Sequence, residues 1–166
     1  MTVGKSPRTT LRGQEKVAVV GNRKGADMAQ VVAFIDSLHT SQPDTLVVSG
    51  GAKGVDELAE SSWFRLGGKV RSYRPAPFGD GYGIEIWNYG GSEPAHVLSV
   101  EHQRVSFANY KSAAIYRDWM IAESVDRLVG FYRDNAAKLV SGAALTASLA
   151  RDRGVSVYDF VAKVAA

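Results

Sequence analysis

A glycine-rich turn, Ser49-Gly50-Gly51-Ala52-Lys53-Gly54, is the segment of this sequence whose residue types most clearly suit ligand chemistry. It follows the apolar run 46–48, which is typical of a buried strand, and leads into apolar residues at helical spacing from Val55. A helix N-terminus has unpaired N–H groups and positive potential, and glycine lets an anion approach the chain. We therefore predict a phosphate site here. The alternative is a turn that only connects a strand to a helix.

Two carboxylates, Asp56 and Glu57, fall at the start of the helix predicted after this turn. The helix dipole favours a carboxylate at this place, where it can also accept hydrogen bonds from backbone N–H groups. A functional role is the alternative: Asp56 binds ribose hydroxyls, or acts with Glu57 in activating water at an N-glycosidic carbon. We favour a structural or ribose-binding role for Asp56 over catalysis.

Arginine side chains are further candidates for binding an anion. Arg117 is predicted to make a charge-assisted, bidentate contact with a phosphate, and the alternative is a surface ion pair with Asp118 or Glu123. Arg23 has a similar predicted role in the turn after the first apolar run. Lys53 is interpreted mainly as a solvated side chain on the loop.

Metal and thiol chemistry find little support in the sequence. It contains no cysteine, which excludes disulfides, thiolate nucleophiles and cysteine-based zinc sites. The three histidines, His39, His96 and His102, are scattered, and none forms the i, i+4 pair of a helical zinc site. We predict neither a metal nor a cofactor.

The overall composition is that of an ordinary globular domain. The 166 residues are 45% hydrophobic and 22% charged, and no apolar run approaches the roughly 20 residues of a membrane span. No secretory segment is evident, so we expect a cytoplasmic protein with no membrane partner. The net charge of +3 is modest and the basic residues are spread out, so charge alone does not indicate nucleic-acid binding. We expect a flexible polar leader at 1–14 and one domain at 15–166.

The pattern of apolar runs predicts an α/β fold. Short apolar runs alternate with helical periodicity, which demands right-handed crossovers and parallel strands. We predict a Rossmann-like, three-layer α/β/α domain with a mainly parallel five-stranded sheet, and ligands at the carboxyl ends of the strands. The strands are expected at 16–21, 45–49, 69–74, 126–132 and 155–160. Helices are expected from Met28 to Leu38, from Val55 to about Leu66, at 97–110 and 113–124, and from Ser141 to about Arg153.

An insertion rich in aromatic residues and glycine, at about 76–104, interrupts this alternation. Residues 76–95 show no clear period, and a loop of this length in a compact domain is usually functional or disordered. Phe78, Tyr82, Trp87 and Tyr89 favour a packed lid or an oligomer contact, and the alternative is that they simply cover the sheet.

Four motifs together resemble the SLOG superfamily, although the glycine turn by itself matches neither GxxxxGK[ST] nor GxGxxG. They are Val19-Val20-Gly21-Asn22-Arg23, Ser49-Gly50-Gly51-Ala52-Lys53-Gly54-Val55-Asp56, Arg117-Asp118-Trp119-Met120 and Ser141-Gly142-Ala143. The superfamily includes the DNA-processing protein of natural transformation, the "lonely guy" phosphoribohydrolases and small YspA-like domains, which look closest. The resemblance covers roughly 16–75 and 108–160. The sequence departs from the YspA-like pattern at Asn22, Asp118 and Ala143, and it lacks the glutamate that serves catalysis in the phosphoribohydrolases.

The resemblance implies a ligand built from nucleotide parts. It implies a sensor or sequestering protein, with N-glycosidic cleavage by a phosphoribohydrolase or nucleosidase as a further activity. A single-stranded DNA binder resembling the DNA-processing protein is the alternative, and an interaction scaffold is a third. Pairing of subunits, frequent in the family, makes a homo-oligomer an expectation. The implied ligand-binding residues are Gly21, Asn22, Arg23, Ser49, Gly50, Gly51, Ala52, Lys53, Gly54, Arg117, Met120, Ser141, Gly142 and Ala143.

Overall fold

The computed structural model describes residues 14–90 and 97–163. Almost all of the predicted leader at 1–14 therefore lies outside the described residues, as do residues 91–96 of the insertion. The described elements are β1 Lys16–Gly21, α1 Met28–Ser41, β2 Leu46–Ser49, α2 Val55–Arg65, β3 Lys69–Phe78, β4 Gly81–Gly90, β5 Val97–Phe107, α3 Tyr110–Ser124, β6 Arg127–Tyr132, α4 Asn135–Leu139, α5 Gly142–Asp152 and β7 Ser156–Val161.

One sheet organises the described chain, with its strands in the order β5-β4-β3-β2-β1-β6-β7. The five strands β3, β2, β1, β6 and β7 pair in parallel, and they correspond to the five strands that we predicted. β4 and β5 extend this set as antiparallel strands beside β3. The α/β class is thus confirmed, but the prediction of a mainly parallel five-stranded sheet is wrong, because the sheet is mixed and has seven strands among the described residues.

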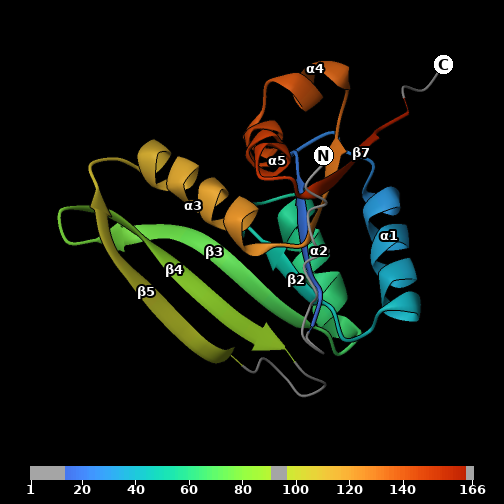
Figure 1. The fold of residues 1–166 in the computed structure, drawn as a ribbon, viewed down its shortest axis with the longest axis horizontal. Coiled ribbons are helices and arrows are strands. Elements are labelled where there is room, and N and C mark those ends of the chain that lie inside the picture. The colour runs from blue at the N-terminus through green and yellow to red at the C-terminus, as the bar shows by residue number, and fades with distance from the viewer. Residues whose placement is uncertain (1–13, 91–96, 164–166) are drawn as a thin grey trace, which may run out of the picture.

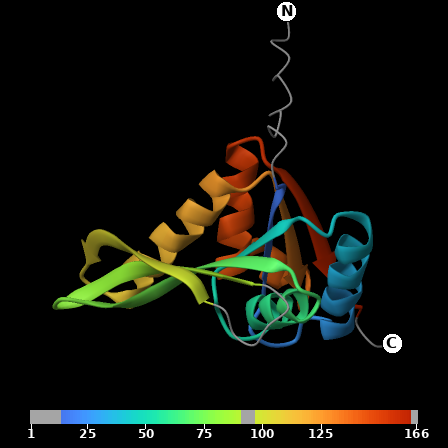
Figure 2. The same ribbon diagram turned by 90° about the horizontal axis from the view of Figure 1, so that it is seen from below.

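Helices cover both faces of the parallel strands, as Figures 1 and 2 show: α1 and α2 on one side, α3 and α5 on the other. Alternating residues of β1 supply the two cores, because successive side chains on a strand point to opposite faces. Val17 and Val19 pack with Ile35 of α1 and Trp63 of α2. Ala18 and Val20 pack in the opposite core, with residues of α3 and α5. None of the helices in the described part of the chain is long and apolar enough to cross a membrane.

The predicted loop at 76–95 and the predicted helix at 97–110 are both wrong. β3 continues to Phe78 and turns directly into β4, which pairs in turn with β5. Period-two patterning is present in β4, where Ile84 and Ile86 are buried and Glu85 and Trp87 lie on the other face. Glycines and prolines obscured this pattern, and pairing between strands outweighed the weak helical spacing of 97–110.

The two antiparallel strands form a ribbon that projects beyond the parallel body (Figures 1 and 2). α3 lies along one face of this ribbon, and its Tyr116 packs with Phe107 of β5 at a ring-centroid distance of 5.1 Å. Tyr82 of β4 also packs against the core on this side. Among the aromatic residues of the insertion, Tyr82 is thus part of the core on this side of the sheet.

Candidate functional site

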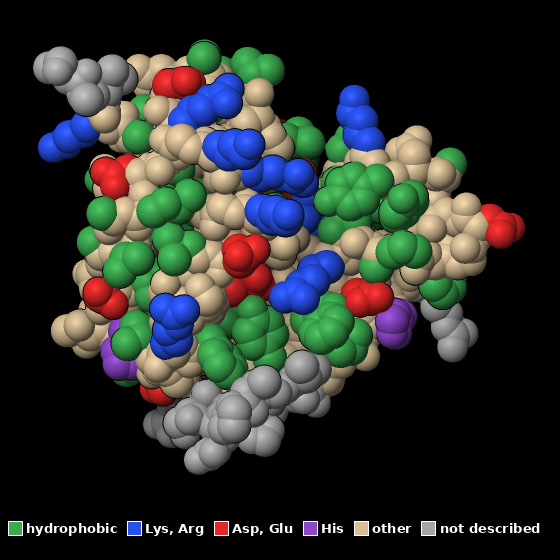
Figure 3. Space-filling model, turned by 180° about the vertical axis from the view of Figure 1, so that it is seen from behind, with side chains coloured by type: hydrophobic (Ala, Val, Ile, Leu, Met, Phe, Trp, Pro, Cys, Tyr) green, Lys and Arg blue, Asp and Glu red, His purple; other side chains and the backbone are tan. Residues whose placement is uncertain are grey.

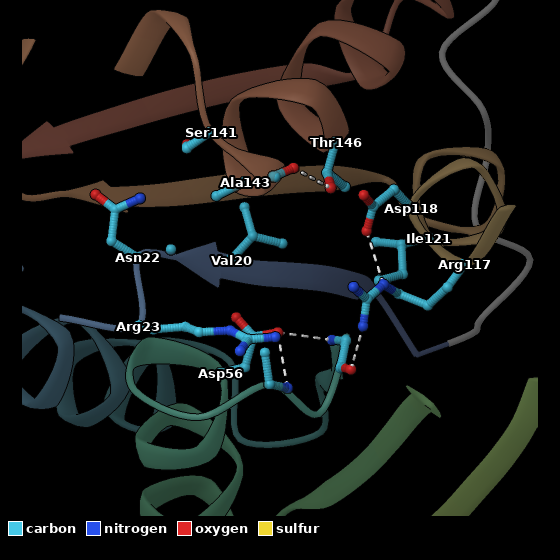
Figure 4. Close-up of a pocket in the computed structure, with 14 residues that line it drawn as sticks. Val20, Asn22, Arg23, Asp56, Arg117, Asp118, Ile121, Ser141, Ala143 and Thr146 are labelled. Atoms are coloured by element: carbon cyan, nitrogen blue, oxygen red, sulfur yellow. Dashed lines mark hydrogen bonds and ion pairs between the residues drawn. The ribbon is translucent and has the colours of Figure 1, made fainter. Parts of the chain in front are cut away.

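A cavity of about 260 Å³ opens at the carboxyl ends of the parallel strands, where the fold class leads one to expect a ligand. Three chain segments that are distant in sequence meet there: the turn after β1, the glycine turn after β2 and the N-terminus of α5. Side chains from α3 close a further side (Figure 4). The lining residues are Val20, Gly21, Asn22, Arg23, Gly50, Ala52, Asp56, Arg117, Asp118, Ile121, Ser141, Gly142, Ala143 and Thr146.

The turn after β1 is held in place by Asn22. Its backbone N–H donates to Phe131 O at 3.1 Å, and its side-chain Oδ1 accepts from the N–H of Arg133 at 2.8 Å. Its carbonyl accepts from the N–H of Val55 at 3.3 Å. Asn22 therefore ties β1 to β6 and to α2, and its side-chain oxygen is already engaged by the protein.

The glycine turn after β2 is also engaged by the protein itself. Asp56 Oδ2 accepts from the N–H groups of Gly50 at 3.1 Å and Ala52 at 3.4 Å. The N–H of Gly51 donates to Ser49 Oγ at 3.0 Å. Three backbone amides of the turn predicted to bind phosphate are therefore already hydrogen-bonded within the protein. An anion would have to displace Asp56 to reach the amides of Gly50 and Ala52, which corrects the geometry that we predicted for this turn.

Arg117 fastens α3 to this turn. Its Nη1 donates to Gly50 O at 2.6 Å and its Nε donates to Asp118 Oδ1 at 2.7 Å. The side chain is only 11% exposed, so the pair with Asp118 is not the surface ion pair considered as an alternative. The predicted bidentate phosphate contact would compete with these two bonds, so Arg117 contributes positive charge to the cavity wall from a fixed position.

Two acids of the cavity are strongly affected by burial. Burial raises the pKa of Asp56 to about 7, against the opposing effect of the Arg117 guanidinium and of the two backbone hydrogen bonds. Burial likewise raises the pKa of Asp118, while Arg117 and Thr146 act in the opposite direction. Asp56 is therefore a candidate for proton-dependent behaviour near neutral pH.

The N-terminus of α5 offers the cavity backbone groups that the protein leaves unpaired. Ser141 caps the helix, with its Oγ accepting from the N–H of Ala144 at 3.1 Å. The N–H groups of Gly142 and Ala143 have no acceptor among the described residues. Because the positive end of the helix dipole lies at the same place, this is the part of the cavity best suited to an anion.

Ten of the sixteen predicted site residues line this cavity: Gly21, Asn22, Arg23, Gly50, Ala52, Asp56, Arg117, Ser141, Gly142 and Ala143. The other six do not. Ser49 is buried beneath the turn, Met120 packs against the core, and Lys53 is exposed; Gly51 and Gly54 also lie outside the lining. Glu57 lines a different cavity from Asp56, so the two carboxylates do not converge on one water molecule.

Four lining residues were not predicted from the sequence as ligand contacts: Val20, Asp118, Ile121 and Thr146. Helical spacing would have found two of them, because Ile121 lies four residues after Arg117 and Thr146 four residues after Gly142. Within residues 14–90 and 97–163, no group of three His, Asp or Glu side chains could hold a metal ion.

Comparisons with known proteins bear on this site. Residues 15–63 match the sequence model of the family described as the YspA, cpYpsA-related SLOG family. This confirms the SLOG resemblance for β1, α1, β2 and most of α2, including the glycine turn. No curated protein matches the sequence of the chain.

Two solved structures share the fold. DNA processing protein A (DprA) of Streptococcus pneumoniae superposes with a TM-score of 0.62 at 22% identity, over 91% of this chain and 52% of that protein. DprA of Helicobacter pylori, whose structure describes a single-stranded DNA binding mode, superposes with a TM-score of 0.63 at 18% identity, over 90% and 66%. The chain thus spans about half of the first protein and 66% of the second, and the similarity concerns the fold.

Proposed function

We propose that this chain, whose residues 15–63 match the model of the YspA, cpYpsA-related SLOG family, binds a nucleotide-derived small molecule in the 260 Å³ cavity. A phosphate of the ligand lies at the N–H groups of Gly142 and Ala143, with Arg23 and Arg117 supplying positive charge. Asp118 is the acceptor available for ribose hydroxyls. The protein acts as a sensor or sequestering protein for this ligand.

The observation that carries the proposal is the pair of unpaired amides of Gly142 and Ala143 on the cavity wall. The first N–H groups of a helix have no acceptor within the helix, and here they face a cavity, so a phosphate can take the place of water at Gly142 and Ala143. The sequence predicted ligand contacts at both the turn after β2 and the turn before α5, and this proposal keeps the turn before α5 as the phosphate site. Both turns still border the same cavity.

Replacing Gly142 by proline tests this proposal directly. Proline at the first position of a helix removes the N–H but suits the helix, and Ser141 already has the extended backbone, with φ −134° and ψ 168°, that a following proline requires. A Cβ at Gly142 meets nothing within 4 Å. We expect Gly142→Pro to fold normally and to weaken the binding of mononucleotides about tenfold, as loss of a hydrogen bond to a charged group predicts.

The matched control is Gly142→Ala, which adds a side chain and keeps the N–H. Thermal-shift screening and calorimetry with mononucleotides, cyclic dinucleotides and ADP-ribose derivatives measure the binding. The proposal fails if none of these ligands stabilises the wild-type protein, or if proline and alanine at position 142 give equal affinities.

Cleavage of an N-glycosidic bond has less support than binding. Asp56 is committed to two backbone amides, and Glu57 lines another cavity. Incubation of the protein with nucleoside monophosphates, followed by chromatography for free base, tests this activity. Homo-oligomerisation stays a proposal from the SLOG resemblance, and light scattering on the purified protein measures it.

Single-stranded DNA binding is the second candidate function. The observation that favours it is the shared fold with the two DprA structures, one of which describes a single-stranded DNA binding mode. Such binding weakens steeply as salt rises, because phosphate contacts release counterions. An oligonucleotide affinity that falls at least tenfold between 50 and about 200 mM salt supports this candidate. A salt-insensitive affinity, or none, favours the small-molecule ligand.

A further inference from the structure

A second cavity, of about 370 Å³, lies between α2 and the strands β3 and β4. Asp56 lines the first cavity and Glu57 the second, so the two cavities flank the first turn of α2. Figure 3 views the α1–α2 side of the molecule, where acidic, basic and large hydrophobic side chains adjoin near the middle of the face. The lining residues of the second cavity are Glu57, Glu60, Ser61, Phe64, Arg74, Trp87 and Tyr89.

Aromatic rings form much of the wall. Trp87 and Tyr89 lie on the same face of β4, two residues apart, and Phe64 of α2 packs against Tyr89 at a centroid distance of 5.8 Å. The indole N–H of Trp87 donates to Glu85 Oε2 at 2.9 Å, which fixes the orientation of the ring. Rings held in this way offer a stacking surface to a planar ligand.

A buried acid with spare acceptor capacity lies in the same cavity. The side chain of Glu60 is 7% exposed, and its Oε2 is 3.8 Å from Arg74 Nη2, which is longer than a hydrogen bond. Its Oε1 has no hydrogen-bond partner among the described residues. Burial raises the pKa of Glu60, and the neighbouring hydroxyls of Ser72, Tyr89 and Ser49 and the Arg74 guanidinium oppose this shift. A buried carboxylate oxygen without a donor marks a place where a ligand N–H would be strongly favoured.

Arg74 shows which chemistry the cavity accepts. Its planar guanidinium lies over Trp87, 4.9 Å from the ring centroid, and faces Glu60. The cavity therefore already holds one flat group that stacks on the indole and presents N–H donors to the acid. A second cation would be repelled by Arg74, whereas an uncharged ring with N–H donors would not.

We propose that the second cavity binds a guanine base, which takes the place of the Arg74 guanidinium over Trp87, with its N1–H and N2–H groups donating to the carboxylate of Glu60. Guanine presents an imino and an amino donor side by side on one edge, which matches the two oxygens of a carboxylate. Adenine, cytosine and thymine do not offer this pair. The site is separate from the one at α5, because the two cavities share no lining residue.

Calorimetric titration with guanosine, inosine and adenosine tests this site without any phosphate. We expect guanosine to bind at least tenfold more tightly than inosine, which lacks the amino group, and than adenosine. Glu60→Gln removes one acceptor oxygen at almost constant volume and should lower guanosine affinity at least tenfold. Trp87→Leu removes the stacking ring by a different route, and Glu101→Gln, on the exposed part of β5, is the control that should leave affinity unchanged.

The source of the base is tested with a thymidine 12-mer that carries one guanine, compared with the 12-mer without it. Preference for the guanine-containing strand over guanosine indicates a base in single-stranded nucleic acid, and the reverse indicates a free nucleoside or nucleotide. Equal binding of the three nucleosides, or guanosine binding that survives both Glu60→Gln and Trp87→Leu in folded protein, overturns the proposal. Gly142→Pro should leave guanosine binding unchanged, so a failure at α5 and a failure here are distinguishable.

Discussion

Two turns with the same serine–glycine beginning lie on one cavity and differ in what their backbone amides do. After β2, the amides of Gly50 and Ala52 are bound by Asp56 and that of Gly51 by Ser49. Before α5, Ser141 caps only the amide of Ala144, and two amides beside it have no acceptor among the described residues. The first turn is closed by the protein and the second is open.

The difference comes mainly from an acidic residue in the first turn of the helix that follows, which α2 has and α5 lacks. α2 begins at Val55, directly after the glycine turn, so the carboxylate of Asp56 in its first turn reaches back to the amides of Gly50 and Ala52. The corresponding first turn of α5 contains Gly142, Ala143, Ala144 and Leu145 and no acid. A glycine turn before a helix is therefore a candidate anion site only when the helix start lacks an acid that can occupy its amides. The glycine turn after β2, which was the strongest motif in the sequence, therefore has its amides bound by the protein's own Asp56 and Ser49.

Removal of the carboxylate of Asp56 is the strongest way to break this contrast. Asp56→Ala leaves the buried amide of Gly50 and the half-buried amide of Ala52 without an acceptor, at about 1–3 kcal/mol for each group. We expect a loss of roughly 3 kcal/mol in the free energy of unfolding at pH 5.5, measured by urea titration. Inorganic phosphate should stabilise the variant more than the wild type, because the opened turn can then bind an anion.

The matched control is Glu57→Ala, the adjacent exposed carboxylate, for which the change should stay within about 0.5 kcal/mol. If Asp56→Ala were as harmless as the control, the hydrogen bonds of Asp56 would not hold the turn closed, and the contrast between the two turns would lose its energetic basis.

The pH dependence of stability gives a second test of the role of Asp56, with a smaller expected effect. The pKa of Asp56 is raised from 3.8 to about 7 in the folded protein, so between these values the folded state binds a proton that the unfolded state has lost. Stability from this group must therefore fall as pH rises, by up to about 1.4 kcal/mol per pH unit until it levels off above the folded pKa. Between pH 5.5 and 7 we expect a decrease of roughly 2 kcal/mol.

Two other acids contribute with the same sign, since burial also raises the pKa of Glu60 and Asp118. Asp56→Ala isolates the share of Asp56: the variant should show a visibly shallower decrease over the same pH range. Parallel curves for the wild type and the variant would contradict the raised pKa of Asp56.

The sequence predicts the parallel part of this fold well, and for a physical reason. Runs such as 17–20 and 46–48 are buried on both faces, so they are continuously apolar and stand out from helical periodicity. The same logic placed ten predicted residues around one cavity, because the ends of parallel strands share an edge. The sequence could not predict which groups Asp56 and Arg117 bind at the glycine turn, because these hydrogen bonds depend on side-chain geometry that residue spacing does not encode.

The antiparallel ribbon shows the other limit. Pro75 and Pro77 lie inside β3, and glycines interrupt β4, so local propensity opposes the strands that form there. Long-range pairing with β5 and cover from α3 override that propensity. The second cavity, with Arg74, Trp87 and Tyr89, is built on these strands, and the loop predicted at this place could not reveal it.

Alanine substitution of one glycine in each turn is the finest test of the comparison, since it should have opposite signs. Gly51 has a φ of +66°, and an added Cβ would lie 2.7 Å from Arg74 Cγ and 2.8 Å from Ser72 Oγ. Gly51→Ala should therefore destabilise the protein by roughly 1–2 kcal/mol. Gly142 starts a helix in open space, so Gly142→Ala should stabilise by about 0.4–1 kcal/mol. Denaturation midpoints that move in the same direction for both variants would mean that the two turns are not held in the distinct conformations described above.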